Sequence, residues 1–260
     1  IVTWLGEQIT DKGFGNGVSM IIFAGIISSI PSAISTIYED FFVNVRSSDL
    51  MSSYIFVALL ILAVLVIVFF TTFVQQAEYK IPIQYTKLEK GAPTSSYLPL
   101  KINPAGVIPV IFASSITTIP STIIPLISNG RDIPWLTNLE KLLNYQTPTG
   151  MVVYAVLIIL FSFFYTFVQV NPEKTAENLQ KGASYIPSVR PGRETEDYLS
   201  SLLKKLATVG SVFLAFISLT PIVAQQMMDL SSSIALGGTS LLILISTGIE
   251  GMKQLEGYLL

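Results

Sequence analysis

Long runs without a charged residue alternate with short charged segments along this chain, and this alternation constrains the fold most. The run Asn103–Ile127, for example, lies in a stretch that has no charge between Lys101 and Arg131. An α-helix rises about 1.5 Å per residue, so about 20 apolar residues cross a bilayer. Apolar residues make up 51% of the chain and charged residues 12%, about half the share usual in soluble proteins. The sequence predicts an all-α membrane protein, a multi-span helical bundle.

The apolar runs divide the chain into a helix end and six spans. Ile1–Leu5 looks like the end of a helix, and the turn-rich segment GEQITDKGFGNG follows it. Because the chain begins without Met inside an apolar run, we expect it to be a piece of a longer protein. The predicted spans are Val18–Tyr38, Ser53–Gln76, Asn103–Ile127, Gly150–Val170, Ala207–Gln226 and a last span that opens with Gly237–Ile249.

Two polar loops, 77–104 and 171–206, are longer than connections between helices usually are. In the first, the alternating pattern of KIPIQY predicts a strand or hairpin arm. In the second, PEKTAENLQKG predicts a helix, with Pro near its start and Gly at its end, and the prolines and Gly192 that follow exclude its continuation. Between the third and fourth spans, IPWLTNLEKLLNY predicts a short amphipathic helix at the membrane interface.

The basic residues predict which loops face the cytoplasm. Of the 15 Lys and Arg residues, all but three fall on one side of the predicted spans: the opening loop, both long loops and the C-terminal end. The three on the other side are Arg46, Arg131 and Lys141. Cytoplasmic loops carry the excess of Lys and Arg, so the long loops and the C-terminus are predicted to be cytoplasmic.

Several chemistries are excluded or disfavoured by composition. The chain has no Cys and no His, which removes thiol nucleophiles, Ser–His triads and His-based metal sites. No predicted span carries Asp or Glu near its centre, which argues against an ion-coupled pump. The hydroxyls of Ser114, Ser115, Thr117 and Thr118 either bind a small solute or cap carbonyls freed by prolines. A secondary transporter and a membrane scaffold or insertase therefore stay as alternatives, and we expect no enzyme and no cofactor.

Four segments of the chain are long enough to compare with known families: WLGEQITDKGFGNGVSMIIFAGI, LPLKINPAGVIPVIFASS, FVQVNPEKTAENLQKGASYIPSVRPG and LGGTSLLILISTGIEGMKQLE. Together they resemble the SecY family, the bacterial protein-conducting channel. The resemblance implies that residues 1–38 hold the end of the fourth span, a cytoplasmic loop and the fifth span. It further implies an external hinge loop at 39–52 and the C-terminal half, spans six to ten, at 53–260. The chain would thus hold one and a fraction of two pseudo-symmetric halves.

The resemblance also implies functional positions. Val18, Ile22, Ile111 and Ile243 match the family's pore ring, an apolar collar that a passing polypeptide pushes open. The span Asn103–Ile127 is rich in proline, with Pro109, Pro120 and Pro125. This proline-rich span matches the lateral gate helix, with Ser114, Ser115, Thr117 and Pro120. Arg190, in the sequence Arg190–Pro191–Gly192, matches the arginine that engages the SecA motor. Lys80 matches a basic position in the preceding loop, where many members have two arginines.

The resemblance implies a function and partners as well. The chain is expected to help conduct secretory proteins across the cytoplasmic membrane and to release membrane proteins into it. The implied partners are the SecE and SecG subunits, the SecA motor ATPase, the ribosome, signal sequences, nascent polypeptides and the lipid bilayer.

Overall fold

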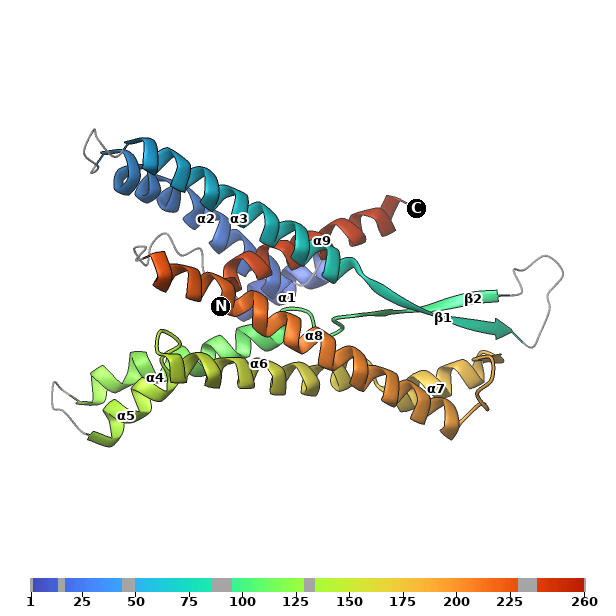
Figure 1. Ribbon diagram of the computed structural model, residues 1–260. Helices are drawn as coiled ribbons and strands as arrows, with labels where there is room; N and C mark the ends of the chain where they lie inside the picture. The colour runs from blue at the N-terminus through green and yellow to red at the C-terminus, as the bar shows by residue number, and fades with distance from the viewer. Residues whose placement is uncertain are drawn as a thin grey trace. The chain divides into compact units, whose positions relative to one another are not determined.

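The computed structural model describes residues 2–13, 17–43, 50–85, 95–128, 134–228 and 238–259. The chain folds into two compact units (Figure 1). The central unit is Val74–Phe216, and the terminal unit combines Ile1–Phe73 with Ile217–Leu260.

The terminal unit is helical in all its described residues except Gly13. Helix α1 packs on α2, and α2 packs on α9. The elements are α1 (Val2–Lys12), α2 (Gly17–Tyr38), the π-helical segment η1 (Glu39–Val43), α3 (Leu50–Gln76) and α9 (Gly238–Leu259), with α3 running three residues into the central unit.

Helix α1 corrects the prediction of a turn-rich segment after Leu5, because it continues to Lys12. The hydroxyl of Thr10 donates to the Gly6 carbonyl at 2.9 Å and accepts from the Gly17 backbone N–H at 2.9 Å. A Cβ on Gly17 would stand 1.9 Å from the Gly6 carbonyl oxygen. Glycine at position 17 therefore serves the close approach of α1 and α2.

The central unit contains a three-stranded sheet in the order β2-β1-β3. Strand β1 (Glu78–Tyr85) pairs antiparallel with β2 (Ser95–Lys101), which confirms that KIPIQY forms a strand and hairpin arm. Strand β1 also pairs antiparallel with β3 (Ser184–Tyr185). The sheet thus joins the two predicted cytoplasmic loops.

Prolines explain why β3 is short. Gln84 on β1 pairs with Tyr185 on β3. If β3 continued for two more residues, Pro187 would face Pro82. Neither residue has a backbone N–H, so the ladder has no donor there and ends. On the other side of β1, Pro82 faces Tyr97. This pair fits the geometry in which strand residues face each other without exchanging hydrogen bonds.

The helices of the central unit confirm most of the predicted elements. They are α4 (Ile108–Ser128), α5 (Pro134–Leu143), α6 (Pro148–Gln169), α7 (Pro172–Lys181) and α8 (Arg193–Met228), the last of which ends in the terminal unit. Helix α7 has the predicted limits: Asn171 caps its start and Gly182 its end. Residues Asn103–Val107 form a turn, so the third predicted span becomes helical only at Ile108.

Helix α8 begins much earlier than predicted, at Arg193 instead of Ala207. Gly192, at φ 103°, makes the turn that precedes it, and Glu194 and Glu196 favour the start of a helix by their charge. The first turns of α8 are amphipathic, and Leu199, Leu203 and Leu206 are buried there. Amphipathic packing, not apolar length, holds this part of the helix.

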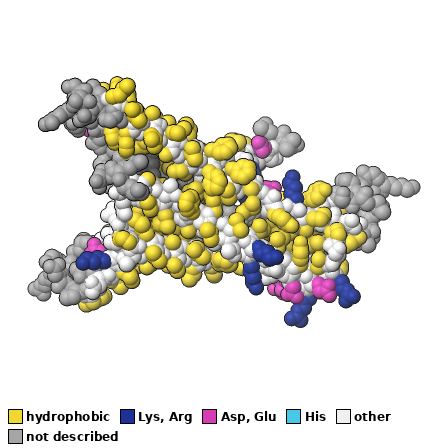
Figure 2. Space-filling view, in the orientation of Figure 1, with side chains coloured by type: hydrophobic (Ala, Val, Ile, Leu, Met, Phe, Trp, Pro, Cys, Tyr) yellow, Lys and Arg dark blue, Asp and Glu magenta, His cyan; other side chains and the backbone are white. Residues whose placement is uncertain are grey.

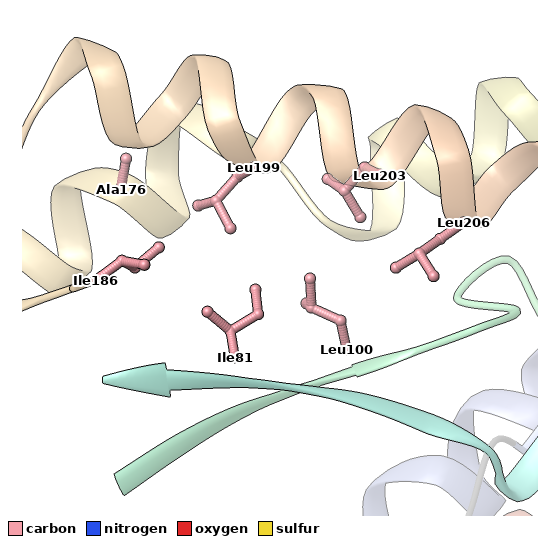
Figure 3. Packing of buried hydrophobic residues seen from close by; sticks show 7 residues of the cluster. All are labelled: Ile81, Leu100, Ala176, Ile186, Leu199, Leu203 and Leu206. Atoms are coloured by element: carbon pink, nitrogen blue, oxygen red, sulfur yellow. The ribbon is translucent and has the colours of Figure 1, made fainter. Parts of the chain in front are cut away.

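A buried cluster packs the two predicted loops into one folded body (Figure 3). We name this the hairpin body: β1, β2, α7, β3 and the start of α8. Each large apolar side chain removed from water contributes about 1.5–3 kcal/mol. The buried members are Ile81, Leu100, Ala176, Ile186, Leu199, Leu203 and Leu206.

Four helical stretches among the described residues are long and apolar enough to cross a membrane. They are Gly17–Val43, Ser53–Gln76, Pro148–Lys181, whose apolar part is α6, and Arg193–Gln226. Of the other two predicted spans, the proline-rich one contains a shorter apolar helix, Ile108–Ile124. The last, α9, is not among the four, and its final turns carry Glu250, Lys253 and Glu256.

Candidate functional site

The predicted partner-binding arginine lies on an exposed tip between β3 and α8. The side chain of Arg190 is 88% exposed, and its guanidinium lies 3.9 Å from a carboxylate oxygen of Glu194. Ion pairs of this kind at the surface contribute little to stability. The guanidinium is therefore loosely held and open to an acidic group of another molecule.

The backbone of this tip is fixed although its side chains are exposed. On one side, the backbone N–H of Val189 donates to the carbonyl of buried Ile186 at 3.1 Å. On the other side, the hydroxyl of buried Thr195 donates to the carbonyl of Arg190 at 2.8 Å. Ser188 has a positive φ of 70°, which an L-residue adopts only when its surroundings hold it. The tip thus presents Arg190 and Pro191 in a set geometry.

The second predicted contact, Lys80, belongs to the same hairpin body. Along β1 the residues Ile81 and Ile83 are buried, whereas Lys80 and Pro82 are exposed on the opposite face. The sequence placed Lys80 and Arg190 in separate loops, and the sheet joins those loops into one body. Charged side chains gather over α7 and the start of α8 (Figure 2). This charged surface is suited to a soluble partner.

The hydroxyls of Ser114, Ser115, Thr117, Ser121 and Thr122 donate to carbonyls of their own helix, α4. Ser114 and Ser115 both donate to the carbonyl of Ile111, at 2.9 and 2.8 Å. Thr117 donates to the carbonyls of Ala113 and Ser114, at 3.1 and 2.9 Å. These are bonds to residues three and four positions back, which serine and threonine often make in helices.

These bonds decide against the idea that the hydroxyls cap the carbonyls freed by prolines. A proline removes the N–H that would bind the carbonyl four residues earlier. For Pro120 that carbonyl belongs to Ile116, and for Pro125 it belongs to Ser121. The hydroxyl bonds of α4 go to Ile111, Ala113, Ser114 and Thr118 instead.

One face of α4 borders a surface hollow, and two of the predicted gate residues, Ser114 and Ser115, lie there. Thr117 is fully buried and lies outside the hollow, and Pro120 is half-buried. The sequence pointed to Thr118 only as a hydroxyl, and it missed Ile119, Thr122 and Ile123, although helical spacing from Ser114 and Ser115 leads to them. The lining residues are Ser114, Ser115, Thr118, Ile119, Thr122 and Ile123.

The residues of the predicted pore ring lie in both units. Val18, in the first turn of α2, is 47% exposed and Ile22 is half-buried, whereas Ile243 on α9 is buried. Helices α2 and α9 pack together in the terminal unit. Ile111 is half-buried on α4, in the central unit. The ring itself stays a prediction.

Comparison with known proteins identifies the relatives of this chain. The SecY family model matches residues 1–252. The chain is 70% identical over 261 aligned residues to the protein translocase subunit SecY of Streptococcus sanguinis, covering 100% of this chain and 60% of that protein. It is 49% identical to the protein translocase subunit SecY of Bacillus subtilis, covering 98% of this chain and 59% of that protein.

The fold also matches solved structures. One described as a protein conducting channel superimposes with a TM-score of 0.67 at 17% identity, covering 98% of this chain and 62% of that one. Another, from work on the plug domain of the SecY protein, gives a TM-score of 0.68 at 17% identity, with the same coverage. The chain therefore spans about 60% of the length of its relatives.

Proposed function

Because this chain belongs to the SecY family, we propose that it forms part of a channel for polypeptides in the cytoplasmic membrane. It is a multi-pass membrane protein, and within the channel it acts without making or breaking a bond. The proposed role is to help conduct secretory proteins across the membrane and to release membrane proteins into it. The observation that carries this proposal is the family match over residues 1–252.

In this proposal Val18, Ile22, Ile111 and Ile243 contribute an apolar collar around the path. Branched apolar side chains exclude water and ions from a narrow passage but yield to a polypeptide. The apolar character of all four positions and the packing of α2 on α9 support this assignment. The hollow along α4 suits a helix that repacks when the channel opens sideways to lipid.

Crosslinking tests the channel proposal. A photoreactive residue at position 111 of the full-length protein should crosslink to a secretory chain stalled during transport. The matched control is position 152 on α6, where Val152 is 65% exposed and faces away from the unit. A small-solute transporter or a scaffold without a pore would give no crosslink at position 111, and that result would overturn the proposal.

The hairpin body is the proposed docking surface for cytoplasmic partners, among them the SecA motor and the ribosome. The exposed guanidinium of Arg190 on a fixed tip supports this role, together with exposed Lys80. The long loops and the C-terminus then face the cytoplasm, as the distribution of Lys and Arg favours. SecE and SecG complete the proposed assembly.

A pair of matched arginine variants tests the docking surface. Arg190→Glu should abolish motor-driven transport into membrane vesicles while assembly with SecE stays intact. Arg193→Glu changes the same charge three residues on, in the first turn of α8, and should keep most of the transport. Normal transport with Arg190→Glu, or an equal loss in both variants, would remove the role of Arg190.

A further inference from the structure

Helix α5 closes one end of the pair formed by α4 and α6. It packs on both of these helices, and they pack on each other. The hairpin body follows the opposite end of α6 (Figure 1). Since α6 supplies the apolar part of a candidate membrane span, α5 lies where that span emerges from the bilayer.

Only part of the apolar surface of α5 is covered by the bundle. At about 100° per residue, its leucines and its tryptophan form one continuous arc. On one side of this arc Leu136 is buried, being 7% exposed, and Leu143 is half-buried. On the other side Trp135, Leu139 and Leu142 are 66%, 40% and 49% exposed.

The polar residues of α5 occupy the rest of its circumference. Asn138 and Lys141 are both exposed and lie beyond the uncovered apolar residues. A helix of this design has three environments around it: protein, an apolar medium and water. The boundary between the headgroups and the acyl chains of a bilayer offers the last two side by side.

The joint between α5 and α6 fixes the angle of α5. The hydroxyl of Thr147 lies within donor distance of the Lys141 and Asn144 carbonyls, at 2.7 and 2.8 Å, and accepts from the Gly150 N–H at 3.1 Å. One side chain thus ends α5 and caps α6. A Cβ on Gly150 would stand 1.9 Å from the Asn144 carbonyl oxygen, so this close approach requires glycine. The α5 helix cannot swing independently of α6.

We propose that α5 is an interfacial anchor whose uncovered face, Trp135, Leu139 and Leu142, lies in the boundary layer of the bilayer. Tryptophan is enriched at this depth, where its ring is apolar and its N–H meets water. The exposed apolar side chains of α6 continue this surface into the membrane, from Val152 through Val156. Because the joint is stiff, the anchor sets the depth of the α4–α6 pair.

The anchor is testable with single cysteines, since these 260 residues contain none of their own. In the full-length protein, made cysteine-free elsewhere, positions 139 and 142 are labelled in turn with a bimane fluorophore. Positions 138 and 141 on the polar arc are the matched controls, and position 152 on the span is the lipid reference. The labelled proteins are placed in vesicles of phosphatidylethanolamine and phosphatidylglycerol.

Two quenchers then read the depth of each label. Labels at 139 and 142 should be quenched at least twofold more by lipids that carry a nitroxide near the headgroup than labels at 138 and 141. Iodide in the water should show the reverse order. All four replaced side chains are exposed, so the variants keep the packing of the unit.

Two results would overturn the proposal. Equal quenching by iodide at 138 and 139 would place the whole helix in water. Protection of position 139 from both quenchers would show that another protein segment covers the apolar face. Either result leaves the channel proposal untouched, because the crosslink at position 111 is read independently.

Discussion

The hairpin body and the α4–α6 pair are neighbours in one unit, but different side chains hold them together. The body buries large apolar residues such as Ile81, Leu199 and Leu203 in one cluster (Figure 3). The pair also buries large side chains, such as Tyr154 and Ile158 on α6, but it adds small and polar ones. Ala113 and Thr117 on α4 are fully buried, as is Ser162 on α6. The Ser162 hydroxyl oxygen has no hydrogen-bond partner among the described residues.

The medium around each region explains this difference. Apolar burial stabilises a fold only where the alternative is water, as it is for the hairpin body. Between helices in lipid this driving force is absent, and close packing of small residues takes its place. The body is therefore built like a soluble domain, whereas the pair is built like a membrane bundle whose contacts are easier to exchange.

The largest expected effect is on the body. Leu203 is fully buried, so Leu203→Ala removes its contacts and leaves a cavity. Such a change costs about 2–5 kcal/mol. Hydrogen exchange of the β1 amides in the full-length protein should accelerate by a factor of at least ten. The adjacent exposed residue provides the control, Lys204→Ala, which should leave exchange unchanged. Equal protection of β1 in both variants would mean that the cluster does not hold the hairpin.

The body could be predicted from the sequence only as separate pieces. KIPIQY and PEKTAENLQKG carry local signals for a strand and a helix, and both elements form. Their assembly depends on contacts between residues about a hundred positions apart, such as Tyr185 with Gln84, which no local pattern announces. The early start of α8 was missed for a related reason: charged residues of its first turns resemble a loop until their buried neighbours are known.

The helices of the pair were easier to predict than their contacts. The apolar run Gly150–Val170 predicted nearly the observed bounds of α6, Pro148–Gln169. A spanning helix satisfies its backbone hydrogen bonds within itself, so its own sequence is enough to predict it. The resemblance assigned Ser114, Ser115 and Thr117 to the gate helix, and that assignment stays a prediction. Ser114 and Ser115 line the hollow, whereas Thr117 is buried. Which way a helix turns its faces depends on its neighbours. The predicted pore ring draws its residues from both units: Val18, Ile22 and Ile243 from the terminal unit and Ile111 from the central unit. The pattern of any single helix therefore does not predict it.

A proline substitution tests whether the pair is built for exchange. Pro120→Ala restores the N–H that the Ile116 carbonyl lacks, and an interior proline costs a helix about 3 kcal/mol. The variant should gain up to about 3 kcal/mol in stability and lose transport activity, since a stiffer α4 repacks less readily. Thermal unfolding and vesicle transport measure the two effects.

Ser115→Ala is the matched control for this proline. Its hydroxyl donates to the Ile111 carbonyl of its own helix and its side chain is exposed, so its removal should change stability by less than about 0.5 kcal/mol. A loss of transport as large as in Pro120→Ala would show that the hydroxyl, and not the proline, carries the function of this face.

The smallest expected effect is at the surface of the body, on α7. The amine of Lys181 lies 2.6 Å from the carboxylate of Glu177. Its hydrogen bond and its positive charge hold the pKa of the Glu177 carboxyl below its usual value. The pair therefore stabilises α7 above the unfolded pKa of glutamate. That contribution is lost as pH falls through the lower folded value.

Titration of Glu177 by carbon NMR should show the lowered pKa, and Lys181→Gln should return it to the ordinary range. Both side chains are more than half exposed, so water and salt screen the pair. The same substitution should leave exchange of the β1 amides unaffected, in contrast to Leu203→Ala. Faster exchange of the β1 amides in Lys181→Gln would mean that surface charge helps to hold the hairpin body together. The contrast between the body and the α4–α6 pair would then no longer rest on apolar burial alone.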